Sequence, residues 1–175
     1  YKVQVSYTGD RGYEIWMEPE YQRRVLGVLW AAGAEHGLRL FGSRALNALR
    51  LEKNFGSWAR EYRPIYGPYE AGMGRFIALK KEAEFIGKAG ATKEKEHGGT
   101  MRLRSFVVDA DDADVIGDEA IWLNGEVRGW VTSGGYAHGS AVSVAMGYVP
   151  GACETGVGGW EIVSFGERGE SKLQG

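Results

Sequence analysis

Three side chains in the first part of the sequence are of types that bind a flat, polar ligand. Tyr7 and Glu14 lie on either side of a Gly-Asp-Arg-Gly turn, and Arg44 follows further along the chain. A carboxylate accepts two N–H groups from the edge of a heterocycle, and an aromatic ring offers a stacking surface. A guanidinium group is suited to a planar carbonyl or a carboxylate. These residue types predict recognition of one planar, polar molecule.

A β-hairpin is expected to position the first two of these residues. Apolar and polar side chains alternate over residues 3–7 and again over 13–17, and Gly9 and Gly12 permit positive φ in the turn between them. Each candidate also has an ordinary structural explanation. Glu14 and Tyr7 fit a strand side chain facing solvent and a strand aromatic. Arg44 fits a surface ion pair on a helix, with Glu52 or Glu14.

Helical spacing follows the hairpin. Residues 21–36 place apolar side chains on one face, which predicts a helix packed inward and ended by Gly37. A second helix is predicted over 43–53, capped by Ser43, with Leu46 and Leu49 turned inward. Residues 54–74 predict an ordered loop, 76–79 a strand and 85–95 a helix.

The loop contains four aromatic residues with two interpretations. They either form the wall of a ligand cavity or pack at a contact between domains. The four are Trp58, Tyr62, Tyr66 and Tyr69.

Beyond residue 98 the pattern changes to a period of two. Strands are predicted over 101–108, 120–123, 126–133, 141–149 and 160–165, with turns at Asn124-Gly125, at Gly134-Gly135 and over 156–159. The charged, glycine-ended stretch 93–99 predicts a domain boundary. The sequence therefore indicates an α+β fold with domains at 1–98 and 99–175, the second a small antiparallel barrel.

Composition argues against several classes of function. With 21 basic and 23 acidic residues the net charge is −2, which gives no electrostatic case for nucleic acid or a membrane surface. The single cysteine, Cys153, excludes an internal disulfide, and the three histidines show no spacing typical of metal ligands. The acidic run 109–114 does not match a calcium loop, so we expect a solvated turn and no metal site.

Four ordered motifs resemble the glycine-cleavage T-protein (aminomethyltransferase) family. They are Tyr-Thr-Gly-Asp-Arg-Gly-Tyr-Glu at 7–14, Gly-Ser-Arg with Leu-Arg-Leu-Glu over 42–52, Pro-Tyr-Glu-Ala-Gly-Met at 68–73 and Phe-Ile-Gly at 85–87. The run 50–58 is most similar to the folate module of dimethylglycine and sarcosine dehydrogenases. The resemblance implies the C-terminal part of a folate-binding aminomethyltransferase domain, followed by a Greek-key β-barrel.

The resemblance also implies a ligand and residue roles. Tetrahydrofolate would be bound by Tyr7, Glu14 and Arg44, with Arg50 and Glu52 bracing the loop that follows. We assign no catalytic residue, because the family's acidic residue belongs to an N-terminal part that this sequence lacks. FAD would be bound only in such a missing N-terminal domain, since no Gly-x-Gly-x-x-Gly fingerprint is present. His138 is expected to shape the contact between the barrel and the folate domain.

Two classes of function remain open at this point. The first is one-carbon transfer to tetrahydrofolate, either in an FAD-dependent dehydrogenase or in a glycine-cleavage aminomethyltransferase. The second is a non-catalytic folate-binding module, such as an iron–sulfur maturation factor. The expected partners are folate, a one-carbon donor, the missing N-terminal domain and a second copy paired through an exposed sheet edge, but neither nucleic acid nor membrane. The expected location is the cytoplasm, or the mitochondrial matrix if the source is eukaryotic.

Overall fold

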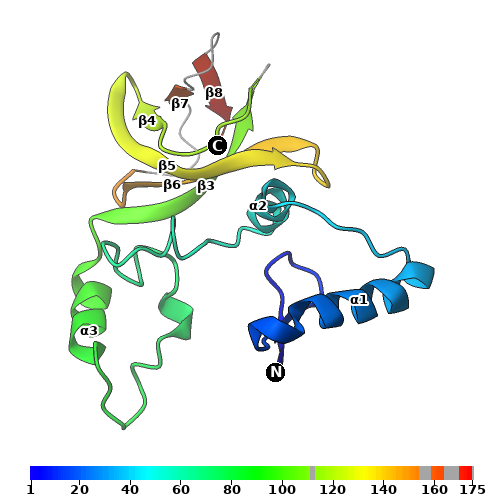
Figure 1. Ribbon diagram of the computed structural model, residues 1–175. Coiled ribbons are helices and arrows are strands. Elements are labelled where there is room, and N and C mark those ends of the chain that lie inside the picture. Colours follow the sequence, from blue (N-terminus) through cyan, green and yellow to red (C-terminus); the bar gives the residue numbers. More distant parts are fainter. Residues whose placement is uncertain (111–112, 154–158, 164–169, 175) are drawn as a thin grey trace.

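A computed structural model describes residues 1–110, 113–153 and 159–163, and the backbone alone of 170–174. Figure 1 shows a β-barrel with helix α2 lying against it. The N-terminal hairpin with α1, and the segment that carries α3, extend from the barrel on separate sides (Figure 1).

The barrel consists of six antiparallel strands. They are β3 (Met101–Asp109), β4 (Ala120–Leu123), β5 (Glu126–Ala137), β6 (Val142–Pro150), β7 (Trp160–Val163) and β8 (Glu170–Gln174). Their order is β3-β6-β5-β4-β7-β8, and pairing of β8 with β3 closes the ring. Because β3 lies beside β6 while β4, β5 and β6 follow one another as neighbours, this part is a Greek key. The predicted α+β class with a Greek-key barrel is confirmed.

Alternating side chains of β3 to β7 form the hydrophobic core. Ile121, Val131 and Ile162 are fully buried at the centre of the cluster. The rings of Phe106 and Trp160 pack within it, with centroids 5.9 Å apart. Burial of such side chains contributes about 1.5–3 kcal/mol each, so the barrel carries the main core of the chain.

Two predicted turns had different outcomes. Asn124 and Gly125 connect β4 and β5 with φ of 53° and 79°, as predicted for a two-residue hairpin. Gly134 and Gly135 instead lie within β5. A Cβ on Gly134 would overlap the carbonyl group of Val115, so this glycine permits a close approach of two backbone segments. Parts of the acidic run, of the turn at 156–159 and of the strand at 160–165 lie outside the described residues.

The N-terminal hairpin pairs β1 (Lys2–Val5) with β2 (Gly12–Ile15). Gly9 has φ of 86° in the connection, as predicted. Gly12 does not adopt positive φ: it belongs to β2 opposite Val5, whose carbonyl oxygen leaves no room for a side chain. The turn lies against the end of α2, because a Cβ on Gly9 would meet the side chain of Lys53.

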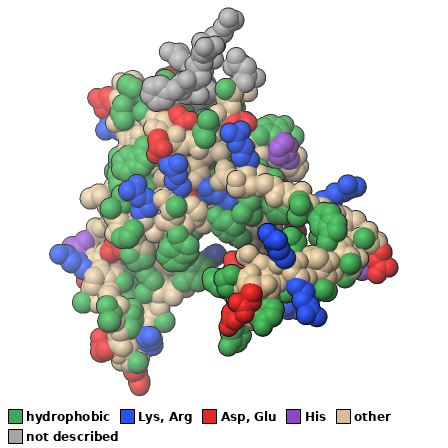
Figure 2. Space-filling model, in the orientation of Figure 1, with side chains coloured by type: hydrophobic (Ala, Val, Ile, Leu, Met, Phe, Trp, Pro, Cys, Tyr) green, Lys and Arg blue, Asp and Glu red, His purple; other side chains and the backbone are tan. Residues whose placement is uncertain are grey.

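The first helical segment comprises η1 (Pro19–Tyr21), α1 (Gln22–Gly33) and η2 (Ala34–His36). Gly37 ends it with φ of 69°, as predicted. The predicted inward packing of this helix is wrong within the part of the chain that the structure describes, where no residue of α1 is buried. Large apolar side chains such as Leu29 and Trp30 are exposed, and hydrophobic groups lie among charged and other polar groups on the visible surface around α1 and the hairpin (Figure 2).

Helix α2 (Ser43–Glu52) contacts the barrel through β5 and β6. Gly42 is its N-cap, so the predicted cap at Ser43 is wrong. Its buried residues are Arg50 and Leu51, whereas Leu49 is exposed. The inward face is therefore rotated from the predicted one, because buried polar contacts rather than two leucines determine how the helix meets the barrel.

An ordered loop follows α2 and leads to η3 and α3, as predicted for residues 54–74. Where a strand was expected over 76–79, the chain forms the short helix η3 (Gly74–Phe76) and a turn, so that prediction is wrong. Hydrogen bonds between neighbouring residues there replace pairing with another strand. Helix α3 (Lys88–His97) begins after Gly87, which has φ of 91°, and covers the later part of the predicted helix.

Candidate functional site

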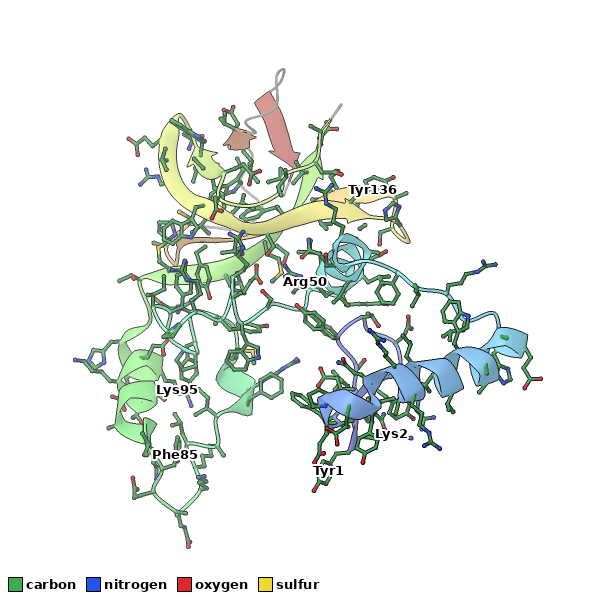
Figure 3. All side chains as sticks on the ribbon, in the orientation of Figure 1. Tyr1, Lys2, Arg50, Phe85, Lys95 and Tyr136 are labelled. Atoms are coloured by element: carbon green, nitrogen blue, oxygen red, sulfur yellow. The ribbon has the colours of Figure 1, made fainter. Side chains whose placement is uncertain are left out.

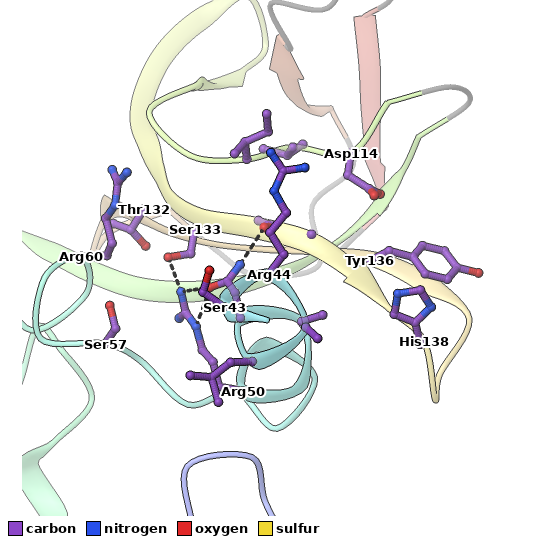
Figure 4. Close-up of a pocket in the computed structure, with 18 of the residues that line it drawn as sticks. Ser43, Arg44, Arg50, Ser57, Arg60, Asp114, Thr132, Ser133, Tyr136 and His138 are labelled. Carbon is purple, nitrogen blue, oxygen red and sulfur yellow. Dashed lines mark hydrogen bonds between the residues drawn. The ribbon is translucent and has the colours of Figure 1, made fainter. Parts of the chain in front are cut away.

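A cavity of about 690 Å³ lies between α2, the hairpin and the barrel. Its size falls within the range of small-molecule sites. Arg44 and Asn47 contribute from α2, Tyr7 from the hairpin connection, and Tyr136 and His138 from the end of β5 and the turn after it. Figure 4 shows the α2 and barrel side chains around this space. The cavity therefore combines aromatic surfaces with polar and cationic groups.

Arg44 and Tyr7 are brought together by the fold. Arg44 is exposed in the first turn of α2, and Tyr7 is half-buried. Neither the Glu52 nor the Glu14 partner considered for Arg44 is present, since this arginine forms no ion pair with any described residue. Its positive charge therefore remains available to a ligand with a carboxylate or carbonyl group.

Glu14 does not line this cavity. It lies on β2 opposite Val3 and is exposed. Its Oε2 accepts a hydrogen bond from the indole N–H of Trp16 at 3.2 Å. Two of the three predicted site residues therefore share one cavity, and the third stands outside it on a strand of the same hairpin as Tyr7.

Glu52 fixes the turn between β5 and β6, on the barrel side of the cavity. Its carboxylate accepts hydrogen bonds from the Ser140 hydroxyl at 2.7 Å and from the Gly139 N–H at 3.2 Å, in the turn between β5 and β6. The hydrogen bond from Ser140, followed by that from Gly139, lowers the pKa of Glu52. The predicted role of Glu52 in bracing the loop after α2 is wrong, because it fixes the turn beside Tyr136 and His138, whose rings meet edge to face at 5.1 Å.

Arg50 has the predicted bracing role. Its Nη1 donates to the Phe55 carbonyl at 3.1 Å, in the loop after α2. The same group forms an ion pair of 3.0 Å with Glu61, and both side chains are buried. Figure 3 shows Arg50 between α2 and the barrel. Sequence reasoning missed Glu61, because an acidic residue in an aromatic loop gives no local sign that it is buried.

The aromatic loop contacts the barrel rather than the cavity. Tyr66 stacks on Tyr148 with ring centroids 3.5 Å apart, and its hydroxyl accepts a hydrogen bond from the Trp130 indole N–H at 3.1 Å. Burial raises the pKa of Tyr148. Trp58 is 83% exposed and meets Tyr62 edge to face. None of the four loop aromatics lines the cavity, and the contacts of Tyr66 with the barrel favour the packing interpretation over the cavity wall.

The described residues offer neither a metal site nor a membrane-spanning helix. These residues contain no group of three or more His, Cys, Asp or Glu side chains placed to hold a metal ion. None of the helices in the same ranges is long and apolar enough to cross a membrane.

Comparison with known families now adds to this geometry. Residues 2–81 match the model of the GCVT N-terminal domain, and residues 102–173 match that of the glycine cleavage T-protein C-terminal barrel domain. The chain belongs to the glycine-cleavage T-protein family. The second match covers the strands of the Greek-key barrel, and the first covers the hairpin, α1 and α2.

Individual members of the T-protein family show how much of them this chain represents. It is 41% identical to mitochondrial dimethylglycine dehydrogenase of Mus musculus over 148 residues, which are 85% of this chain and 17% of that protein. It is 33% identical to an aminomethyltransferase of Synechocystis sp., over 85% of this chain and 38% of that protein. The chain thus spans only a minor part of each of these relatives.

The fold agrees with a solved T-protein. The crystal structure of glycine cleavage system aminomethyltransferase T from Bartonella henselae matches 99% of this chain and 47% of its own, with a TM-score of 0.83 and 23% identity. This similarity confirms the aminomethyltransferase-type arrangement of hairpin, helices and barrel.

Proposed function

We propose that this chain is the tetrahydrofolate-binding C-terminal portion of a one-carbon transfer enzyme of the dimethylglycine or sarcosine dehydrogenase type. The cavity that joins Tyr7 and Arg44 to the barrel is the observation that carries the proposal. The identity of 41% to dimethylglycine dehydrogenase, against 33% to an aminomethyltransferase, favours the dehydrogenase type. Tetrahydrofolate, when bound, accepts the one-carbon unit.

The residues present fit such a ligand in chemical terms. A folate has a flat heterocycle with N–H donors at one end and carboxylates at the other. Arg44, which forms no ion pair with a described residue, offers its guanidinium to a carboxylate or carbonyl group, and Tyr7 offers a half-buried ring at the same cavity. Glu14, on the hairpin, is of the type that accepts a pair of N–H groups, and Oε1 of its carboxylate accepts no hydrogen bond from a described residue. The protein's own contribution is to hold the ligand and exclude water around it.

The remaining parts of the activity belong, in this proposal, to a preceding part of a longer protein. That part would supply the acidic residue for catalysis, the FAD domain and the one-carbon donor. Residues 1–98 and 99–175 are then the end of the folate-binding domain and the barrel domain. If the source is eukaryotic, we place the protein in the mitochondrial matrix, because the dimethylglycine dehydrogenase of Mus musculus is mitochondrial.

Titration calorimetry with tetrahydrofolate tests the proposal in the full natural protein. We expect saturable binding that Arg44→Ala and Glu14→Ala each weaken by about tenfold or more, as for loss of a hydrogen bond to a charged group. Arg24→Ala on α1 and Glu35→Ala on η2 are matched controls, since both residues are exposed and neither lines the cavity. Absence of binding, or equal losses in the control variants, would overturn the proposal.

A further inference from the structure

The contact between α2 and the barrel is built around two buried charges. Arg50 is 3% exposed and Glu61 is 0% exposed, with Nη1 of Arg50 donating to Oε2 of Glu61 at 3.0 Å. Taking an ion pair out of water costs several kcal/mol unless the geometry is good and the remaining hydrogen-bonding groups find partners. The arrangement of those partners therefore shows what the pair achieves.

One network joins the pair to both sides of the contact. Arg50 donates from Nη2 to the Ser133 hydroxyl at 2.6 Å, and from Nε to the Asn47 side-chain oxygen at 2.9 Å. The Ser133 hydroxyl in turn donates to Oε1 of Glu61 at 2.6 Å. A single hydroxyl of β5 thus accepts from the helix and donates to the loop (Figure 4 shows the contact between Arg50 and Ser133).

Glu61 is also fixed from its own loop. Its Oε2 accepts the backbone N–H of Ser57 at 2.7 Å. Burial acts to raise the pKa of Glu61, but the hydrogen bonds from Ser133 and Ser57 and the charge of Arg50 outweigh it, so the pKa lies below the usual value. The side chain is therefore an anion with a partner at both oxygens. Each partner has a required direction, which an apolar contact would not impose.

The same residues form part of the cavity wall. Asn47, Arg50 and Ser133 line it, and the side-chain N–H of Asn47 also reaches the carbonyl oxygen of Gly134 at 3.3 Å. Arg44 stands three residues before Asn47 on α2, so the two occupy neighbouring positions on one helix face. A rotation or shift of α2 along β5 would move Arg44 relative to the barrel wall.

We infer that Glu61 is a positioning residue for the cavity: it fixes Arg50, and through Arg50 and Ser133 it holds α2, and with it Arg44, at one setting against β5. Glu61 itself is absent from the residues that line the cavity, so it acts through its partners. As regards ligand binding, the inference rests on the proposed function. As regards the setting of α2, it stands on the contacts alone.

Two measurements in the full natural protein test the position of α2 and the effect on ligand binding separately. Amide hydrogen exchange without ligand reports the setting of α2, and calorimetry reports the affinity for tetrahydrofolate. The variants are Glu61→Gln and the milder Ser133→Ala. The control is Glu70→Gln, because that carboxylate joins the loop to the start of β3 through N–H groups of Gly67 and Met101 but does not line the cavity.

We expect Glu61→Gln to speed exchange in residues 44–51 and to weaken tetrahydrofolate binding by about tenfold or more, with a smaller effect of Ser133→Ala. Glu70→Gln should leave both quantities unchanged even if it lowers the unfolding midpoint. Equal effects of Glu61→Gln and Glu70→Gln on affinity, or unchanged exchange in 44–51, would overturn the inference. If Glu61→Gln does not fold, Ser133→Ala decides by the same two readouts. If the unaltered protein binds no tetrahydrofolate, the proposed function fails, while the exchange data still test the positioning role.

Discussion

The burial of the Arg50–Glu61 pair allows us to predict how much stability is lost when one partner is removed. In the variant Arg50→Met, Glu61 would remain fully buried without its counter-charge, and in Glu61→Leu the guanidinium would lose its own. Breaking a buried ion pair from one side costs about 3–5 kcal/mol. We expect each single variant to lose stability in this range.

The double variant distinguishes the charge from the space it fills. Replacing both partners with apolar side chains leaves neither charge at this contact, although the Asn47 side chain, the Ser57 N–H and the Ser133 hydroxyl lose partners. We expect the double variant to be less destabilised than the sum of the single variants by about 2 kcal/mol or more, within the range seen for residues in direct contact.

Urea unfolding, with the midpoint and the slope both fitted, measures these values. The exposed pair Arg60–Asp118 is a matched control, because it also joins the loop to the barrel, with side chains 49% and 77% exposed and a distance of 2.9 Å. Its single variants should lose less than about 1 kcal/mol. Losses at Arg50 and Glu61 no larger than in this control, or strictly additive ones, would refute the reasoning.

Three further predictions concern acid, backbone space and assembly. Glu61 and Glu70 have pKa values that are lower in the folded state than the usual 4.5. The stability they contribute is therefore present above pH 4.5 and is lost as the pH falls through their folded pKa values. Urea midpoints measured from neutral to acidic pH should drop in this window, and less steeply in Glu61→Gln. Gly129→Ala should destabilise the barrel strongly, since its Cβ would overlap the carbonyl oxygen of a residue in β6. Gly27→Ala, in α1 where nothing lies near the added Cβ, should raise the free energy of unfolding by about 0.5–1 kcal/mol. Pairing between copies along the unpaired edges of β1 and β2 should make sedimentation depend on concentration, and a constant monomer value at high concentration would contradict it.

Features that depend on a few neighbouring residues were predicted well. The turn at Asn124-Gly125 and the helix end at Gly37 require positive φ, which their residue types favour locally. Period-two alternation located β3, β4, β5 and β6 because one face of each strand meets the barrel core. Tyr7 and Arg44, both predicted to bind the ligand, line one cavity, and the binding role of each stays a prediction.

Features that depend on contacts between distant segments were missed. Gly134 has the composition of a turn, yet it lies within a strand because a backbone segment from another part of the barrel passes close to it. Glu61 is fully buried and accepts hydrogen bonds from Arg50 on α2 and from Ser133 on β5, contacts that the loop's own sequence does not indicate. The rotated face of α2 has the same cause, since its buried side was predicted from leucine spacing and is determined by polar partners on β5.

The candidate site therefore has two sides of different rigidity. Arg44 stands on a helix held to the barrel by a buried network, and Asn47 and Glu52 add contacts to β5 and to the turn after it. Glu14 stands on a two-stranded hairpin, an element of marginal stability by itself, next to an α1 helix with no buried residue in the described part of the chain. Ordering the hairpin would use part of the binding free energy that Glu14 contributes, whereas the helix that carries Arg44 is already held to the barrel. It follows that the contribution of Glu14 to ligand affinity depends on how well the hairpin is packed. The contribution of Arg44 depends instead on the Arg50–Glu61 network.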